Sequence, residues 1–94
     1  MTNSEKFVSQ VNPSALAHYL RGKGWVQFKI RRIDIEIYQY LMDGQLLEQV
    51  TIPIDKELFD YSEALYESMQ AVAGFEGRSV EEILKDLLAD PGNS

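Results

Sequence analysis

Few side chains in this chain are of the types that do chemistry, and they do not form a known catalytic arrangement. His18 is the only histidine and cysteine is absent, so a zinc site and a thiol nucleophile are not expected. Asp60, Glu63 and Glu67 have the spacing of one helix face, but without the spacing of a calcium loop they are typical of a solvated acidic surface. We therefore predict that the protein is not an enzyme and that it uses no cofactor and no metal.

The elements that carry these residues can be placed from the hydropathy pattern, and the clearest of them is a β-hairpin. Residues 25–54 alternate between apolar and polar types with a period of two, which is typical of strands. Asp43-Gly44 within this stretch favours a two-residue turn, because both residues tolerate a positive φ. A turn at this place predicts three apolar cross-strand pairs: Leu41 with Leu46, Ile37 with Val50, and Ile35 with Ile52.

A third strand precedes the hairpin. A reversal near Arg31-Arg32 would pair Phe28 with Ile35. Because two arginines are unusual in a tight turn, a longer loop of about four or five residues is the alternative. Both alternatives give a three-stranded antiparallel meander. Its predicted core face consists of Val26, Phe28, Ile35, Ile37, Val50 and Ile52.

Three helices are predicted around this sheet. Asn12-Pro13 combines a capping residue with a proline at the first helical position, so a helix is expected from there to about Arg21. After the sheet, Asp55 is expected to cap a second helix. Ser79 and Glu82 form a capping box that opens a third helix.

These elements predict the fold class and the domain organisation. The order is α-β-β-β-α-α, an α+β fold in which a three-stranded antiparallel meander packs against helices. With 94 residues, the chain has room for one domain. Residues 1–12 are expected to be an N-terminal arm, residues 13–90 the domain, and residues 91–94 a C-terminal tail or the start of a linker.

A partner-binding surface is predicted on the side of the sheet opposite to its core face. The alternation that turns the isoleucines inward turns Trp25, Tyr38, Tyr40 and Leu47 outward. Tyrosine and tryptophan are enriched at the energetic centres of protein interfaces. Two other interpretations stay open, namely that the helix at residues 13–21 covers this face as a second small core, and that the face is simply solvated.

The charges are unevenly distributed along the chain. The net charge is −6, yet residues 1–32 contain six basic side chains and one acidic one, while residues 33–94 contain three basic and fourteen acidic ones. Such asymmetry predicts either a surface for a charged partner or pairing within the molecule or a dimer. The basic cluster consists of Arg21, Lys23, Lys29, Arg31 and Arg32.

Nucleic acid is the partner class that a basic cluster next to an aromatic residue first suggests. The predicted order of elements is also that of double-stranded-RNA-binding domains. Those domains carry lysines at the start of the helix after the sheet, whereas residues 55–60 of this chain (DKELFD) have a net charge of −2 and would repel phosphate. Binding of nucleic acid is therefore not favoured, although it stays an alternative for the basic cluster.

Several short motifs resemble the N-terminal portion of longer, uncharacterised bacterial proteins, cyanobacterial ones among them. The motifs are LAHYL at residues 16–20, Gly24-Trp25, Ile52-Pro53-Ile54, Asp60-Tyr61, and Gly77-Arg78-Ser79 followed by Ile83-Leu84. The resemblance covers about residues 13–88. It implies a domain that is followed by more chain, and it carries no activity and no functional residue. The chain departs from that pattern at Arg31-Arg32.

Together these observations predict a non-catalytic protein–protein interaction module, either the N-terminal domain of a larger bacterial protein or a small subunit of a complex. The expected partner is a protein or a second copy of the chain, with no small-molecule substrate. A nucleic-acid-binding domain and an acidic chaperone or regulator of a basic partner are the alternatives. The chain has no apolar run that suits a membrane span or a signal peptide, so a cytoplasmic location is expected.

Overall fold

A computed structural model describes residue 8 and residues 10–89, and it confirms the predicted α+β fold. The elements are α2 (Pro13–Gly22), β1 (Val26–Phe28), β2 (Ile35–Met42), β3 (Gln45–Pro53), α3 (Tyr61–Glu76) and α4 (Val80–Ala89). The strands form one antiparallel sheet in the order β1-β2-β3. The predicted tail at residues 91–94 and most of the predicted arm lie outside the described residues.

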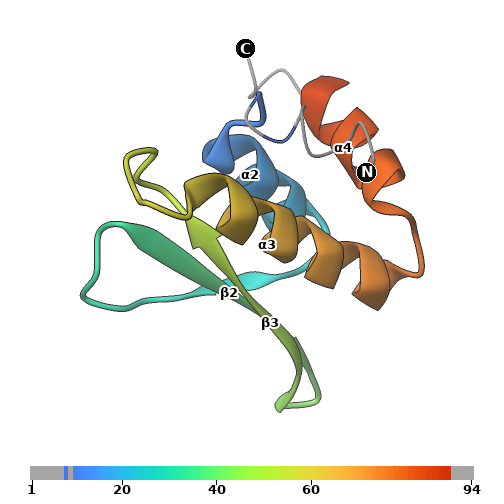
Figure 1. The fold of residues 1–94 in the computed structure, drawn as a ribbon. Helices are drawn as coiled ribbons and strands as arrows, with labels where there is room; N and C mark the ends of the chain where they lie inside the picture. Colours follow the sequence, from blue (N-terminus) through green and yellow to red (C-terminus); the bar gives the residue numbers. More distant parts are fainter. Residues whose placement is uncertain (1–7, 9, 90–94) are drawn as a thin grey trace.

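The helices lie together on one side of the sheet (Figure 1). Helix α3 packs against β3, and α2 packs against both β3 and β1. Helix α4 packs on α2 and α3 instead of on the strands. Because all three helices share one side, the other face of the sheet is left without a covering element from the part of the chain that the structure describes.

The predicted caps of the first and last helices are confirmed. The side-chain oxygen of Asn12 accepts a hydrogen bond from the Ser14 N–H at 3.3 Å, and Pro13 occupies the first helical position. At the start of α4, the Glu82 N–H donates to the Ser79 hydroxyl at 3.2 Å, and the Ser79 N–H donates to the Glu82 carboxylate at 3.1 Å. This reciprocal pair is a capping box.

The predicted start of the second helix is wrong. Asp55 caps a turn rather than a helix, since its carboxylate accepts from the Glu57 N–H at 2.9 Å and its carbonyl accepts from the Leu58 N–H at 3.1 Å. Helix α3 begins at Tyr61, whose ring is the first in this segment to be buried in the core. It ends before Gly77, whose φ of 69° is the left-handed conformation that glycine adopts at little cost.

The hairpin turn is where the sequence predicts it. Asp43 and Gly44 have φ values of 53° and 80°, and Leu41 lies opposite Leu46 as expected. Beyond that pair the register shifts, because β3 carries one extra residue, Leu47, that has no partner on β2. Such a β-bulge changes which residues of the two strands share a face.

The bulge makes the other two predicted pairs wrong. Tyr38, rather than Ile37, lies opposite Val50, and Ile37 lies opposite Thr51. Ile35 lies opposite Pro53 instead of Ile52. Since a shift of one residue turns side chains to the other face of a sheet, β2 presents its tyrosines to Val50 and Ile52, and its isoleucines lie on the opposite face.

The first strand pairs two residues further along β2 than a tight reversal at Arg31-Arg32 would require. Phe28 lies opposite Ile37 and Val26 opposite Gln39. Residues 29–34 therefore form a loop between β1 and β2, longer than either alternative considered from the sequence. Ile54 and Asp55 donate their N–H groups to the Asp34 carbonyl, which ties this loop to the segment that leaves β3.

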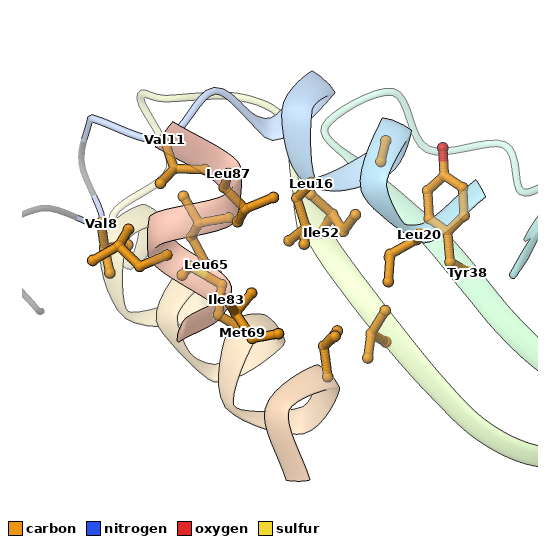
Figure 2. Close-up of a cluster of buried hydrophobic side chains, with 14 of the residues drawn as sticks. Val8, Val11, Leu16, Leu20, Tyr38, Ile52, Leu65, Met69, Ile83 and Leu87 are labelled. Carbon is orange, nitrogen blue, oxygen red and sulfur yellow. The ribbon is translucent and has the colours of Figure 1, made fainter. Parts of the chain in front are cut away.

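The hydrophobic core lies between the sheet and the helices, and it is built on the even-numbered residues of β2 and β3. Tyr38 is 0% exposed and lies with Leu20 in the core, while Ile52 lies with Leu16 (Figure 2). Val8 and Val11 are also fully buried in the same cluster, so the described part of the predicted arm is anchored to the domain. Four of the six residues predicted to form the core face of the sheet are instead on its other face: Val26, Phe28, Ile35 and Ile37.

Candidate functional site

The face of the sheet that points away from the helices is the candidate functional site, and we call it the open face. Its apolar members are Val26, Phe28, Ile35, Ile37, Leu41 and Leu46. Phe28 and Val26 are 50% and 48% exposed, and Phe28 lies opposite Ile37 on the neighbouring strand. A group of neighbouring exposed apolar residues marks an interaction site more often than scattered apolar residues do.

The open face continues onto a projecting hairpin. The turn between β2 and β3 stands clear of the helices (the green tip in Figure 1). Leu41 and Leu46 pair there. The side chains of Met42 and of the bulge residue Leu47 are exposed to about the same fraction as those of Leu41 and Leu46. Four long apolar side chains thus flank a two-residue turn with little cover from the rest of the domain.

The centre of the open face is polar. Gln39 lies on the middle strand and donates from its side-chain amide to the Gln49 side-chain oxygen at 2.7 Å. A carboxamide has two N–H donors and an oxygen acceptor. This bond therefore leaves Gln39 with a donor and an acceptor that can reach outward from the face.

The edges of the sheet are poorly suited to pairing with another strand. Strand β1 has three residues, and short edge strands are a common protection against edge pairing. On β3, the Gln49 N–H donates to the Glu48 carboxylate at 3.1 Å and the Ser68 hydroxyl donates to the Thr51 carbonyl. Pro53 has no N–H to offer. A partner would therefore bind the face of this sheet rather than extend it.

The aromatic surface predicted for a partner is buried inside the molecule. Trp25 is 3% exposed, and its ring centroid lies 5.6 Å from that of Tyr40 and 5.4 Å from that of Phe75 in α3. Tyr38 donates its hydroxyl to the Glu36 carboxylate at 3.0 Å, and burial followed by this bond raises its pKa. The prediction that Trp25 and Tyr38 lie on an outer face is wrong. The alternative of cover by the helix at residues 13–21 is right in part, because α3 covers this face together with α2, and the face belongs to the main core.

The fourth residue of that prediction, Leu47, is exposed on the projecting hairpin. Sequence reasoning missed Phe28 and Ile37 as surface residues because it assigned them to the core. A signal for the correct assignment is present in the adjacent leucines Leu46 and Leu47. Two successive apolar residues break the alternation and indicate a bulge between the turn and the rest of the strand.

The predicted basic cluster is divided among separate places. The Lys23 ammonium lies 5.4 Å from the Tyr19 ring centroid. Arg32 binds Asp34 through two hydrogen bonds of 2.9 and 2.6 Å, which hold the pKa of that carboxyl below its ordinary value. Arg21 lines a depression beside Glu36 on the helix side of the sheet. Within residues 10–89, Lys29 and Arg31 have no ion pair, and both lie in the loop between β1 and β2.

A polar network connects the helices on the far side of the molecule. Tyr19 donates its hydroxyl to the Glu76 carboxylate at 2.6 Å and accepts from the Arg78 guanidinium at 2.8 Å. Arg78 also binds Asp86 at 2.7 Å. Burial, and next the bond to Glu76, raise the pKa of Tyr19. All four side chains are used in holding α2, α3 and α4 together, so we assign this network a structural role.

The acidic side chains of α3 and the segment before it lie on the surface, as predicted. Asp60, Glu63 and Glu67 are exposed. Among the described residues, no group of three histidine or acidic side chains is placed to hold a metal ion. The described helices are also too short or too polar to cross a membrane. Comparisons of the chain with protein-family models, curated proteins and solved structures gave no match.

Proposed function

We propose that this domain is a non-catalytic protein–protein interaction module and that its binding surface is the open face of the sheet. The observation that carries the proposal is the exposure of Phe28 and Val26 on a face that also holds the side chains of Ile35 and Ile37. The resemblance of the motifs to the N-terminal portion of longer bacterial proteins supports a role as one part of a larger protein or complex.

Energetics support binding through this face. Complete burial of a side chain such as Phe or Ile stabilises by about 1.5–3 kcal/mol relative to full exposure. Phe28 is half-exposed and Ile37 partly exposed, so a partner that covered both would gain a substantial part of that free energy from each. An interface usually has a buried apolar centre that is surrounded by polar and charged groups. Lys29 and Arg31 lie within three residues of Phe28 in the sequence and can supply such charged groups.

The alternative functions receive less support from the geometry. Nucleic acid would require a continuous basic surface, and the basic cluster is divided between the end of α2 and the loop at residues 29–34, where Arg32 is paired with Asp34. The acidic surface of α3 would suit a basic partner, but surface carboxylates are common in acidic proteins and carry little information by themselves.

Photo-cross-linking tests the proposal. A photoreactive phenylalanine analogue replaces Phe28 in the chain expressed in its native cells, and the matched control carries the analogue at Phe59. Phe59 is an aromatic residue with 105% exposure outside the sheet. We expect a defined covalent adduct from position 28 and not from position 59.

A second substitution shows whether the adduct depends on the open face. Ile37→Ser, next to position 28 on the sheet, should reduce the adduct at least tenfold if the loss is about 1.4 kcal/mol of binding free energy. Glu63→Ser on α3 should leave it unchanged. Adducts of equal yield from positions 28 and 59, or insensitivity to Ile37→Ser, would refute the proposal.

A further inference from the structure

We infer that the open face binds a second copy of this chain, with the two sheets packed face to face and their strands running in opposite directions. This inference rests on the proposed function and names the occupant of the same surface. In the proposed dimer, a two-fold axis passes near Gln39. The loop at residues 29–34 of one copy then lies over the hairpin turn of the other.

Charge complementarity selects the antiparallel arrangement. Lys29 and Arg31 lie at one end of the sheet, and Asp43 lies in the turn at the other end. If the two sheets packed with parallel strands, the basic loops of both copies would come together and repel each other. The antiparallel arrangement instead places the basic loop of each copy near Asp43 of the other.

The acidic parts of the molecule do not oppose this dimer. Glu63 and Glu67 are on α3 and Asp86 is on α4, and both helices lie on the opposite side of the sheet from the open face (Figure 1). Face-to-face packing therefore leaves the acidic helices of the two copies on the outside. Repulsion between them is weakened by distance and by salt, because the Debye length is about 8 Å at physiological ionic strength.

The polar centre of the open face is self-complementary. Gln39 lies near the middle of β2, and one of its amide N–H groups binds Gln49. The remaining N–H and the carbonyl oxygen can bind the same groups of a Gln39 related by two-fold symmetry. A carboxylate or an ammonium group at this place would instead meet a like charge.

The size of the face fits a dimer of moderate affinity. Strands of three, eight and nine residues cover roughly 320 Å² of flat sheet at the usual spacing and rise. With side-chain relief, two such faces bury on the order of 1,000 Å², near the lower limit for a specific interface. We therefore expect a dissociation constant in the micromolar range rather than an obligate dimer.

Molar mass as a function of concentration is the first test. Sedimentation velocity from about 1 μM to about 1 mM, the range in which a micromolar dimer forms, should show a shift from one chain to two. Phe28→Ser should weaken dimerisation at least tenfold, whereas the matched control Phe59→Ser should not change it. Circular dichroism of each variant establishes that it is folded.

Site-specific cross-linking tests the arrangement of the two copies. The chain has no cysteine, so a single introduced cysteine reports one position. Gln39→Cys should give a covalent dimer with a bismaleimide of about 10 Å, the distance between packed sheets. Arg31→Cys should give none, because antiparallel packing separates the two loops by more than about 25 Å. The exposed control Glu63→Cys on α3 should also give none.

Each outcome bears on a different part of the account. A constant mass of one chain up to about 1 mM, or a dimer that Phe28→Ser leaves intact, would overturn self-association through this face. Efficient dimerisation of Arg31→Cys would overturn the antiparallel arrangement. If the chain stays monomeric while position 28 forms an adduct of higher mass with another protein, self-association is refuted and the proposed interaction function stands. If neither the dimer nor an adduct is found, both fail.

Discussion

Tyr38 is the residue whose position most directly links the sheet to its helices. Its side chain is fully buried in the core cluster, and its hydroxyl is satisfied by Glu36. Replacement of a large buried aromatic side chain with alanine removes apolar burial and leaves a cavity. The cost is about 3–5 kcal/mol.

We therefore expect Tyr38→Ala to lower the free energy of unfolding by about 3–5 kcal/mol. Phe28→Ala is the matched control, since Phe28 is half-exposed on the other face and should cost about 1 kcal/mol. Urea unfolding of both variants measures the difference. Equal costs would contradict the assignment of the two faces of the sheet.

Three tyrosines make stability sensitive to alkaline pH. Burial raises the pKa of Tyr19, Tyr38 and Tyr61 above the ordinary value of 10.0, and bonds to Glu76 and Glu36 add to the effect at the first two. Because the folded state keeps these phenols neutral to a higher pH than the unfolded chain does, their contribution to stability is fully present below pH 10. It is lost as the pH rises through the raised pKa values.

Urea unfolding at several alkaline pH values should show this loss. The free energy of unfolding should fall progressively above about pH 10, and Tyr38→Phe should reduce the steepness of that fall. Tyrosinate absorbance should rise together with the loss of helical circular dichroism. Complete ionisation of the tyrosines in a chain that remains folded would contradict the assigned burial.

At the scale of elements, the bulge at Leu47 is an extra residue of β3 that has no partner on β2. Deletion of Leu47 would remove the extra residue and give a regular hairpin in which Leu41 stays opposite Leu46 and Tyr38 stays opposite Val50. The tyrosines and Val50 then still share one face, because Leu46 and Glu48 become successive residues and successive residues alternate between faces. We therefore expect the deletion variant to retain its helical circular dichroism and a cooperative thermal transition.

Deletion of Ile33 is the control for this prediction. Ile33 is 93% exposed in the loop between β1 and β2, and surface loops tolerate changes in length. The control should retain most of its helical signal and a cooperative thermal transition. If removal of Leu47 abolishes the helical signal while removal of Ile33 does not, Leu47 is not a dispensable extra residue of β3.

The network at Tyr19 connects helices that are distant in sequence. Tyr19→Phe removes the hydroxyl that binds both Glu76 and Arg78, and we expect a loss of about 1 kcal/mol in the free energy of unfolding. Tyr66→Phe on α3 is the control, because the Tyr66 hydroxyl has no hydrogen bond within the described part of the chain. No difference between the two variants in urea unfolding would contradict the role of the network.

Local signals in the sequence predict most of the turns and helix caps, but they do not predict which face of the sheet is buried. The turn at Asp43-Gly44 and the capping box at Ser79 depend on neighbouring residues, and both are where the pattern predicts them. The strand at residues 35–42 is apolar on both faces, with Ile37 on one and Tyr38 on the other. Alternation therefore cannot decide which face is buried, and the register shift that decides it arises in the partner strand.

The candidate site could not be predicted from the sequence for the same reason. Phe28 has the residue type of a core position, and it is exposed because it shares a face with the isoleucines of β2, which lie on the side away from the helices. The loop before β2 moves the pairing by two residues and so leaves the face of Phe28 unchanged. The division of the basic cluster depends on long-range folding, which places Arg21 and Arg32 on different elements.

At the scale of the whole molecule, the domain has two layers and one uncovered side. Helices α2 and α3 cover the face of the sheet that carries Tyr38, and α4 covers the helices (Figure 1). The remaining face carries apolar side chains on all three strands. An apolar sheet face with protected edges is suited to packing against another layer, and this arrangement underlies both the proposed function and the proposed dimer.

Cysteine labelling tests the identity of the uncovered face most directly. The native chain has no cysteine, so Phe28→Cys and Val50→Cys each report one face, and Val50 is 3% exposed. At low micromolar concentration, Phe28→Cys in the folded protein should react with a thiol reagent at nearly the rate of the unfolded chain. Val50→Cys should be protected at least a hundredfold, a difference of about 2.7 kcal/mol. Rapid labelling at position 50 together with protection at position 28 would contradict the account, because it would show that the opposite face of the sheet packs against the helices.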